Sequence, residues 1–230
     1  FPRVTTADIV QRLLYHTELP KITEPASNVL IQMVHDPDWR YAFDDPTSKP
    51  NAKRLQEFLK MKENIGDGYV YNWIKLGKYS SGSYLDPRPN LRFIARNIRI
   101  MTECGVRGYF CQTVQSRGTE MQDLRYYLLA RAMWRPEIDS RETIREFCNL
   151  YYSAGAPEVI RYIDFLHDEY GGKDRSRETQ SDTTVLYGDA YITTGDAILA
   201  AAESKAETPE IKHRVATCRL PIWKLKLDRA

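Results

Sequence analysis

Imidazole and carboxylate side chains follow a buried strand predicted at 28–34. His35, Asp36 and Asp38 come directly after this apolar run, at the end where its polar groups would emerge. A carboxylate in such a place can act as a general base or accept a hydrogen bond from a ligand hydroxyl. We therefore predict Asp36 as a catalytic candidate and His35 and Asp38 as ligand-binding candidates. Asp-Pro-Asp is also common turn chemistry, which is the structural alternative.

Glu120 is the second catalytic candidate. It lies at the start of a helix predicted at 118–134 and is the nearest acid to Gln112, which ends a predicted strand. Gln112 is predicted to bind a ligand at the end of that strand. The structural alternative for Glu120 is a first-turn interaction with the helix dipole, worth about 0.3–1 kcal/mol.

Three further side chains are candidates for binding. His16 also ends an apolar run, and together with His35 it would form a polar pocket wall. Two histidines and an aspartate can bind a metal, but no metal-ligand spacing such as HxxxH is present, so we predict neither a metal nor a cofactor. Asn72 and Trp73 alternate in direction along a predicted strand. Either the amide bonds a ligand hydroxyl or the indole offers a stacking surface.

The elements that must position these residues form an alternating pattern of strands and helices. Helical periodicity follows at least the last three strands, with a tight turn at Glu103-Cys104-Gly105. Such βα units build parallel sheets, whose ligand sites lie at the carboxyl ends of the strands. The predicted strands are 9–15, 28–34, 69–74 and 106–112, and the predicted helices are 51–63, 90–104 and 118–134.

Four βα units amount to half of a (β/α)8 barrel. A four-stranded parallel sheet alone would leave bare edges and one uncovered face, which predicts a missing N-terminal half of the barrel or a partner chain. After Trp134 the strand pattern stops. We therefore predict an α/β fold, with the C-terminal half of a TIM-like barrel over residues 1–135 and an α-helical subdomain over 136–230.

The helical subdomain has clear start and stop signals. Asp139 or Ser140 caps its first helix, and Pro221 breaks or kinks its last one. The predicted helices are 141–152, one from the Gly155-Ala-Pro157 corner to Tyr170, one from about Thr194, and 209–227.

Composition bounds the possible partners. The chain has 230 residues, of which 42% are hydrophobic, and its 33 basic and 31 acidic residues are interspersed, so no charge field selects nucleic acid. No apolar run suits membrane insertion, and the N-terminus lacks a signal-peptide pattern. The cysteines have no CxxC spacing and are predicted to be small buried side chains: Cys104, Cys111, Cys148 and Cys218.

Several segments together resemble one family. They are 89–92, 97–101, 105–110, 118–134 and 144–152. The combination resembles the bacterial DUF4838 proteins, which are similar to glycoside hydrolases of the α-glucuronidase and hexosaminidase type, and the likeness runs from about Asp8 to the end. It implies a (β/α)8 barrel, a polysaccharide or glycoconjugate substrate and a periplasmic or extracellular location.

The resemblance also implies a mechanism, acid/base hydrolysis of a glycosidic bond, for which we expect Asp36 and Glu120 to supply carboxyl groups. Two positions depart from the family pattern. This chain has Asn72 and Cys111 where the family commonly carries Asp and Glu. The alternative expectation is therefore a catalytically decayed carbohydrate-binding protein on the same fold.

Overall fold

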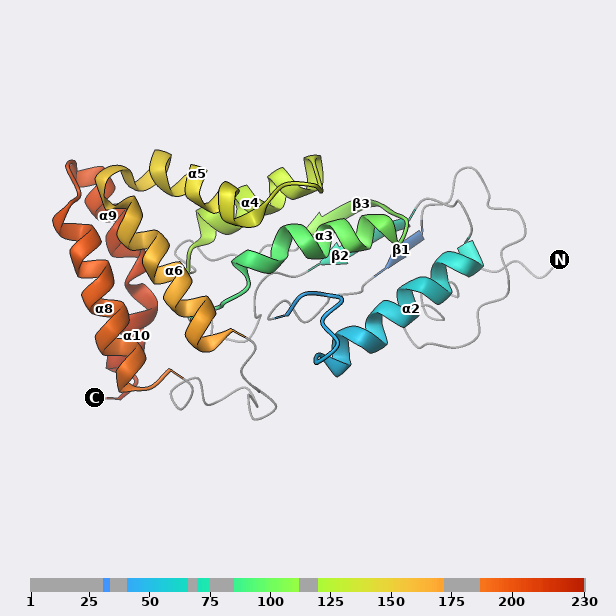
Figure 1. Cartoon of the computed structure of the whole chain (residues 1–230), viewed down its shortest axis with the longest axis horizontal. Helices are drawn as coiled ribbons and strands as arrows, with labels where there is room; N and C mark the ends of the chain where they lie inside the picture. Colours follow the sequence, from blue (N-terminus) through green and yellow to red (C-terminus); the bar gives the residue numbers. More distant parts are fainter. Residues whose placement is uncertain are drawn as a thin grey trace. The chain divides into compact units, whose positions relative to one another are not determined.

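The computed structural model describes residues 31–33, 41–65, 70–74, 85–111, 120–171 and 187–229, and for the first two strands it describes the backbone alone. The chain forms two compact units, one of residues 1–76 and 96–113 and one of residues 77–95 and 114–230. Figure 1 shows the elements in chain order. The second unit thus includes α4 (Gln122–Trp134), which lies within the range assigned above to the barrel.

Three short strands form a parallel sheet in the first unit. They are β1 (Ile31–Met33), β2 (Val70–Ile74) and β3 (Val106–Cys111), and the order in the sheet is β1-β2-β3. Ile31 pairs with Val70, which in turn pairs with Val106. The strands predicted near 28–34, 69–74 and 106–112 are thus confirmed, while the one predicted at 9–15 lies outside the described residues.

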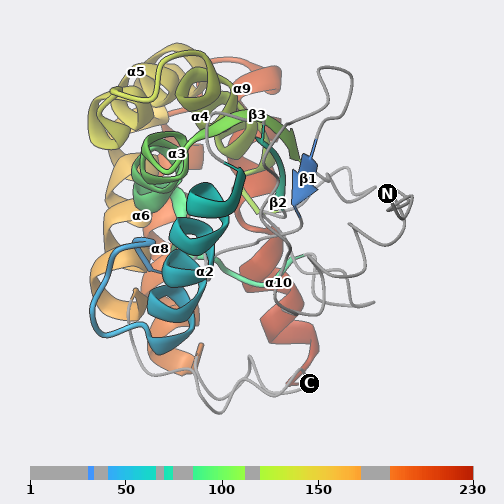
Figure 2. The same ribbon diagram turned by 90° about the vertical axis from the view of Figure 1, so that its right-hand side faces the viewer.

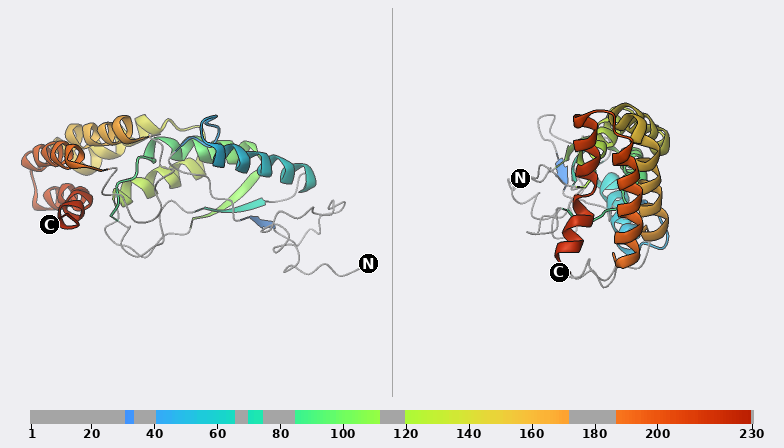
Figure 3. Two further views of the ribbon diagram at one scale, coloured as in Figure 1. Left: turned by 90° about the horizontal axis from the view of Figure 1, so that it is seen from below. Right: turned by 90° about the vertical axis from the view of Figure 1, so that its left-hand side faces the viewer.

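The helices that follow β1 and β2 lie on one side of this sheet. Figures 2 and 3 show α2 (Lys49–Ile65) and α3 (Ile94–Glu103) on the same face. The Tyr109 hydroxyl of β3 donates to the Ile98 carbonyl of α3 at 3.0 Å. Gly105 has a φ of 99°, which suits glycine, and it forms the tight turn predicted between this helix and β3.

Asn97 fixes the segment that leads into α2. Its Oδ1 accepts from the Phe43 N–H at 2.6 Å, and its Nδ2 donates to the Tyr41 carbonyl at 3.2 Å. The Phe43 ring packs edge-on against Phe58 of α2, with centroids 5.6 Å apart. Both ends of the fully buried Asn97 amide are therefore satisfied by backbone groups.

The described residues of the second unit are mainly helical. The Asp139 side chain caps α5 by accepting from the Glu142 N–H at 2.8 Å, as predicted. Pro221 lies in the first turn of α10, so the helix predicted at 209–227 is in fact two helices. The helices are α4 (Gln122–Trp134), α5 (Ser140–Tyr152), α6 (Ala156–Tyr170), α8 (Asp189–Ser204), α9 (Pro209–Cys218) and α10 (Leu220–Leu227).

Buried tyrosines and a close helix approach form the core of this unit. The hydroxyls of Tyr162 on α6 and Tyr191 on α8 are hydrogen-bonded at 2.6 Å. Gly195 lets Ile222 of α10 approach α8, because a Cβ at this position would lie 3.1 Å from Ile222 Cδ1 and 3.3 Å from the Tyr162 ring. The helical subdomain predicted from the sequence is confirmed in character, although α8 begins at Asp189 and not near Thr194.

The described part of the chain is mainly helical and contains one small sheet. The alternation of strands and helices is present for β1, β2 and β3, but these three strands do not define the predicted half-barrel. Among the helices that the structure describes, none is both long enough and apolar enough to cross a membrane.

Candidate functional site

The structure describes the side chain of one predicted site residue, Glu120. Asn72 and Trp73 lie in β2, where only the backbone is described, and the Cα of Asn72 pairs with those of Met33 and Tyr109. The other predicted residues lie outside the described ranges: His16, His35, Asp36, Asp38 and Gln112.

Glu120 is buried and paired, unlike an acid in the first turn of a helix. It precedes α4, which begins at Gln122, and it is 2% exposed. Arg125 Nη2 donates to Glu120 Oε2 at 2.6 Å and to its backbone carbonyl at 3.0 Å, while Arg125 Nη1 donates to Asn90 Oδ1. Glu120 therefore precedes the first turn of α4 and does not lie in it as expected, and its carboxylate is held by Arg125 from one turn further along the chain.

The surroundings of Glu120 perturb its titration. Burial raises the pKa of Glu120, while the positive charges of Arg125 and Arg88 act in the opposite direction. The Arg88 backbone N–H also faces this carboxylate, but Glu120 Oε1 makes no hydrogen bond of ordinary geometry within the described residues. A buried carboxylate oxygen without a donor is a costly feature that calls for an explanation.

Arg88 and Asp86 extend this group of charges. Burial, reinforced by the charge of Arg125, lowers the pKa of Arg88 to about 10. Asp86 Oδ1 is buried and lies 3.4 Å from Lys224 Nζ, with no hydrogen bond among the residues described. We refer to Asp86, Arg88, Asn90, Glu120 and Arg125 as the charge cluster.

Met121 connects the charge cluster to a pocket. Its φ of 49° and ψ of 37° place it in the left-handed region, which costs a residue with a Cβ about 1–2 kcal/mol. It is buried and precedes the first turn of α4 without capping it through its side chain. Strained backbone of this kind is concentrated at functional sites.

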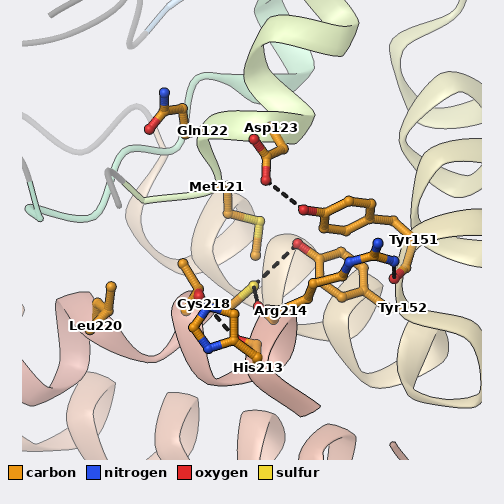
Figure 4. Close-up of a pocket in the computed structure, with 10 residues that line it drawn as sticks. Met121, Gln122, Asp123, Tyr151, Tyr152, His213, Arg214, Cys218 and Leu220 are labelled. Carbon is orange, nitrogen blue, oxygen red and sulfur yellow. Dashed lines mark hydrogen bonds between the residues drawn. The ribbon is translucent and has the colours of Figure 1, made fainter. Parts of the chain in front are cut away.

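The pocket has a volume of about 460 Å³ and lies among α4, α5, α9 and the start of α10. This volume falls in the range of small-ligand sites. Figure 4 shows its wall, where Tyr151 and Tyr152 lie near Asp123 and Arg214. The polar members include Gln122, Asp123, Tyr151, His213, Arg214 and Thr217.

Tyr151 organises one wall of the pocket. Its hydroxyl donates to Asp123 Oδ2 at 2.6 Å, as Figure 4 shows. The guanidinium of Arg214 lies 4.1 Å from the centroid of its ring, and Arg214 Nη1 donates to its carbonyl at 3.1 Å. Phe147 also stacks on the ring, at 4.8 Å. With these neighbours packed on the ring, its role is to position Asp123 and Arg214.

Cys218 lies at the pocket but is poorly suited to be a nucleophile. It is 2% exposed, and burial raises the pKa of its thiol to about 12. The Tyr152 hydroxyl lies 3.3 Å from its sulfur. Because the thiolate is the reactive form, burial disfavours reaction at this sulfur. All four cysteines are free, and three are buried as predicted, while Cys111 is only partly buried.

The pocket residues were missed by the sequence analysis, because they come from three helices far apart in the chain. No local motif marks Asp123, Tyr151 or Arg214, and helical periodicity predicts only that each lies on a helix. Within the ranges described, no group of three or more histidine, cysteine, aspartate or glutamate side chains is placed to hold a metal ion.

The fold and the pocket together define an α/β chain with a polar site in its helical unit. The sequence model of a family described as a domain of unknown function, DUF4838, matches residues 8–164. Because this match covers more than half of the chain, the protein belongs to the DUF4838 family. No curated protein and no solved structure matches the chain.

Proposed function

We propose that this chain is a carbohydrate-binding part of a sugar-active protein and that the pocket among α4, α5 and α9 holds a sugar unit. The observation that carries the proposal is the composition of the pocket wall. A carboxylate, an amide, a guanidinium, an imidazole and a hydroxyl converge on about 460 Å³. Sugars present many hydroxyls that both donate and accept, so a wall of mixed planar polar groups suits them.

The preorganisation of the wall supports binding of a rigid, hydroxylated ligand. Tyr151 holds Asp123 and Arg214 in place before a ligand arrives. A ligand then meets acceptors and donors that lose little side-chain freedom on binding. The family likeness to glycoside hydrolases points to the same class of ligand.

We also propose that β1, β2 and β3 are consecutive strands of a (β/α)8-type barrel. Two features support this arrangement. The strands are parallel and neighbour one another in chain order. In addition, α2 and α3 lie on one side of the sheet, as the outer helices of such a barrel do (Figure 3).

The number of carboxyl groups that line the pocket favours binding over hydrolysis. Cleavage of a glycosidic bond uses two carboxyl groups. The described pocket wall offers one, Asp123, while Glu120 is buried against Arg125. Hydrolysis is the alternative, and it predicts that N72D/C111E gains activity on aryl-glycosides. Measurable hydrolysis by the unaltered protein would refute a binding-only role.

The binding proposal is tested with His213, whose exposed ring borders the pocket. A panel of oligosaccharides is screened by saturation-transfer NMR, and the best ligand is measured by calorimetry. We expect His213→Ala to weaken binding about 3- to 10-fold, the effect of losing one hydrogen bond worth about 0.5–1.5 kcal/mol.

Lys212→Ala is the matched control, since Lys212 is exposed on the same helix and does not line the pocket. It should leave the affinity unchanged. The proposal fails if no oligosaccharide in the panel binds at millimolar concentration, or if the two variants weaken binding equally.

A further inference from the structure

The seam between α4 and α5 continues away from the pocket. At the pocket, the Tyr151 hydroxyl of α5 donates to Asp123 of α4. One turn further along α4, the Tyr127 hydroxyl donates to Glu146 Oε1 of α5 at 3.1 Å. Residue numbers rise along α4 as they fall along α5, so the two helices are antiparallel and their facing side chains meet turn by turn. We refer to Tyr127, Arg131 and Glu146 as the seam triad.

The seam triad is an exposed network of hydrogen bonds. Arg131 Nη1 donates to the Tyr127 hydroxyl at 2.7 Å and to Glu146 Oε1 at 3.2 Å. The side chains of Arg131 and Glu146 are 44% and 46% exposed, so both keep surface that a ligand can reach. An ion pair with this exposure adds little to stability. Its effect is to hold a phenol, a guanidinium and a carboxylate in fixed positions at the surface.

Aromatic rings connect the seam triad to the pocket. The centroid of the Phe147 ring lies 5.2 Å from that of Tyr127 and 4.8 Å from that of Tyr151, and all three rings are half-buried. Leu150, which is 78% exposed, lies one turn from Glu146 on the same side of α5. Polar groups and accessible apolar surface therefore occur together along the seam. A sugar presents the matching combination of hydroxyls and C–H faces.

The polar groups of α4 repeat once per helical turn. Asp123, Tyr127 and Arg131 are four residues apart, so they lie on one face at intervals of about 6 Å along the axis. This interval is close to the length of one sugar ring in a linear chain. The first member of the row lines the pocket, and the other two belong to the seam triad.

We propose that the seam triad binds the second and third units of a linear oligosaccharide whose first unit occupies the pocket. The ligand class is then an extended glycan and not a single sugar. Glu146 accepts hydrogen bonds from hydroxyls of the outer units, and Arg131 donates to them. This inference rests on the proposed sugar pocket, which the Asp123–Tyr151 pair joins to the seam.

The test measures how affinity depends on the length of the sugar chain. Three series are titrated by NMR: glucose to cellotriose, xylose to xylotriose, and N-acetylglucosamine to chitotriose. In at least one series, we expect the trisaccharide to bind about 10-fold more tightly than the monosaccharide, because the outer units add hydrogen bonds. His213→Ala should weaken every member of that series, since His213 borders the pocket.

Substitutions in the seam triad should affect the longer sugars alone. Glu146→Gln should weaken the trisaccharide about 5- to 10-fold and leave the monosaccharide unchanged, because the charged acceptor is lost. Tyr127→Phe keeps the ring and loses the hydroxyl, and it should weaken the trisaccharide about 3-fold. A purely structural role for either residue would weaken all lengths alike. Arg145→Gln is the control, since Arg145 precedes Glu146 and is exposed, and it should match the unaltered protein.

The outcomes separate the seam from the pocket. Equal affinity for monosaccharide and trisaccharide, with both weakened by His213→Ala, overturns the seam proposal and leaves the pocket standing. An unchanged trisaccharide affinity in both Glu146→Gln and Tyr127→Phe also overturns it. The seam proposal fails too if no member of the three series binds at millimolar concentration, and the pocket is then judged by the wider oligosaccharide panel.

Discussion

Buried polar side chains of the two units differ in how completely they are hydrogen-bonded. In the first unit, the amide of Asn97 bonds Phe43 and Tyr41, and the hydroxyl of Tyr109 bonds α3. Each of these groups ends on a backbone partner, so its hydrogen-bonding capacity is used to hold the fold. Such complete satisfaction is the ordinary state of a buried polar side chain.

The second unit leaves polar capacity unused around Glu120. Glu120 Oε1 and Asp86 Oδ1 are buried and make no hydrogen bond of ordinary geometry among the described residues, although Lys224 Nζ lies 3.4 Å from Asp86 Oδ1. Met121, directly beside them, has strained backbone. The contrast is between buried polar groups that are fully hydrogen-bonded in the first unit and buried carboxylate oxygens that are left without a hydrogen bond in the second. Substitutions can test this contrast.

The largest effect is expected from Arg125→Met. The change leaves the Glu120 carboxylate buried without its 2.6 Å partner and removes the hydrogen bond to Asn90. Breaking one side of a buried ion pair costs about 3–5 kcal/mol. Urea denaturation should show a loss of this size in the free energy of unfolding.

The double variant Glu120→Leu/Arg125→Met separates pairing from packing. It should lose less than the sum of the two single variants, with a coupling energy of about 1–3 kcal/mol. Additive losses would show that Glu120 and Arg125 do not stabilise each other, and the charge cluster would then need another explanation.

Asn97→Ala tests how much a fully hydrogen-bonded buried amide stabilises the first unit. It removes the partners of the Phe43 N–H and the Tyr41 carbonyl and should destabilise the protein by about 2–4 kcal/mol in the same assay. Asn149→Ala is the control, because Asn149 is exposed on α5 and should cost little. Equal losses in the two variants would remove the argument that Asn97 holds the first unit together.

Local signals in the sequence were sufficient for most element positions. The apolar run at 28–34 and the β-formers at 69–74 predicted strands that the structure contains. Asp139 or Ser140 was predicted as the cap of α5, with Glu142 placed to help, and Gly105 was predicted to lie in a tight turn. Each of these features depends on residues that are close together in the chain.

Features that depend on distant residues were not predictable. Glu120 was expected in the first turn of a helix, but left-handed Met121 delays α4 until Gln122, and Arg125 then takes the carboxylate. The pocket needs Asp123 of α4 beside Tyr151 of α5, and no periodicity in one helix reveals a partner in another. Tertiary packing decides such pairs.

The smallest expected loss of stability is that of removing the exposed helix cap at Asp139 in the second unit. Asp139→Ala removes the cap of α5 and should lower the free energy of unfolding by about 1 kcal/mol. Asp139→Asn should cost almost nothing, because asparagine caps equally well. Neither change should alter the loss of stability caused by Arg125→Met, since Asp139 is exposed and outside the charge cluster. If Asp139→Ala cost as much as Arg125→Met, burial would not decide how much a polar contact contributes, and the contrast between the two units would lose its meaning.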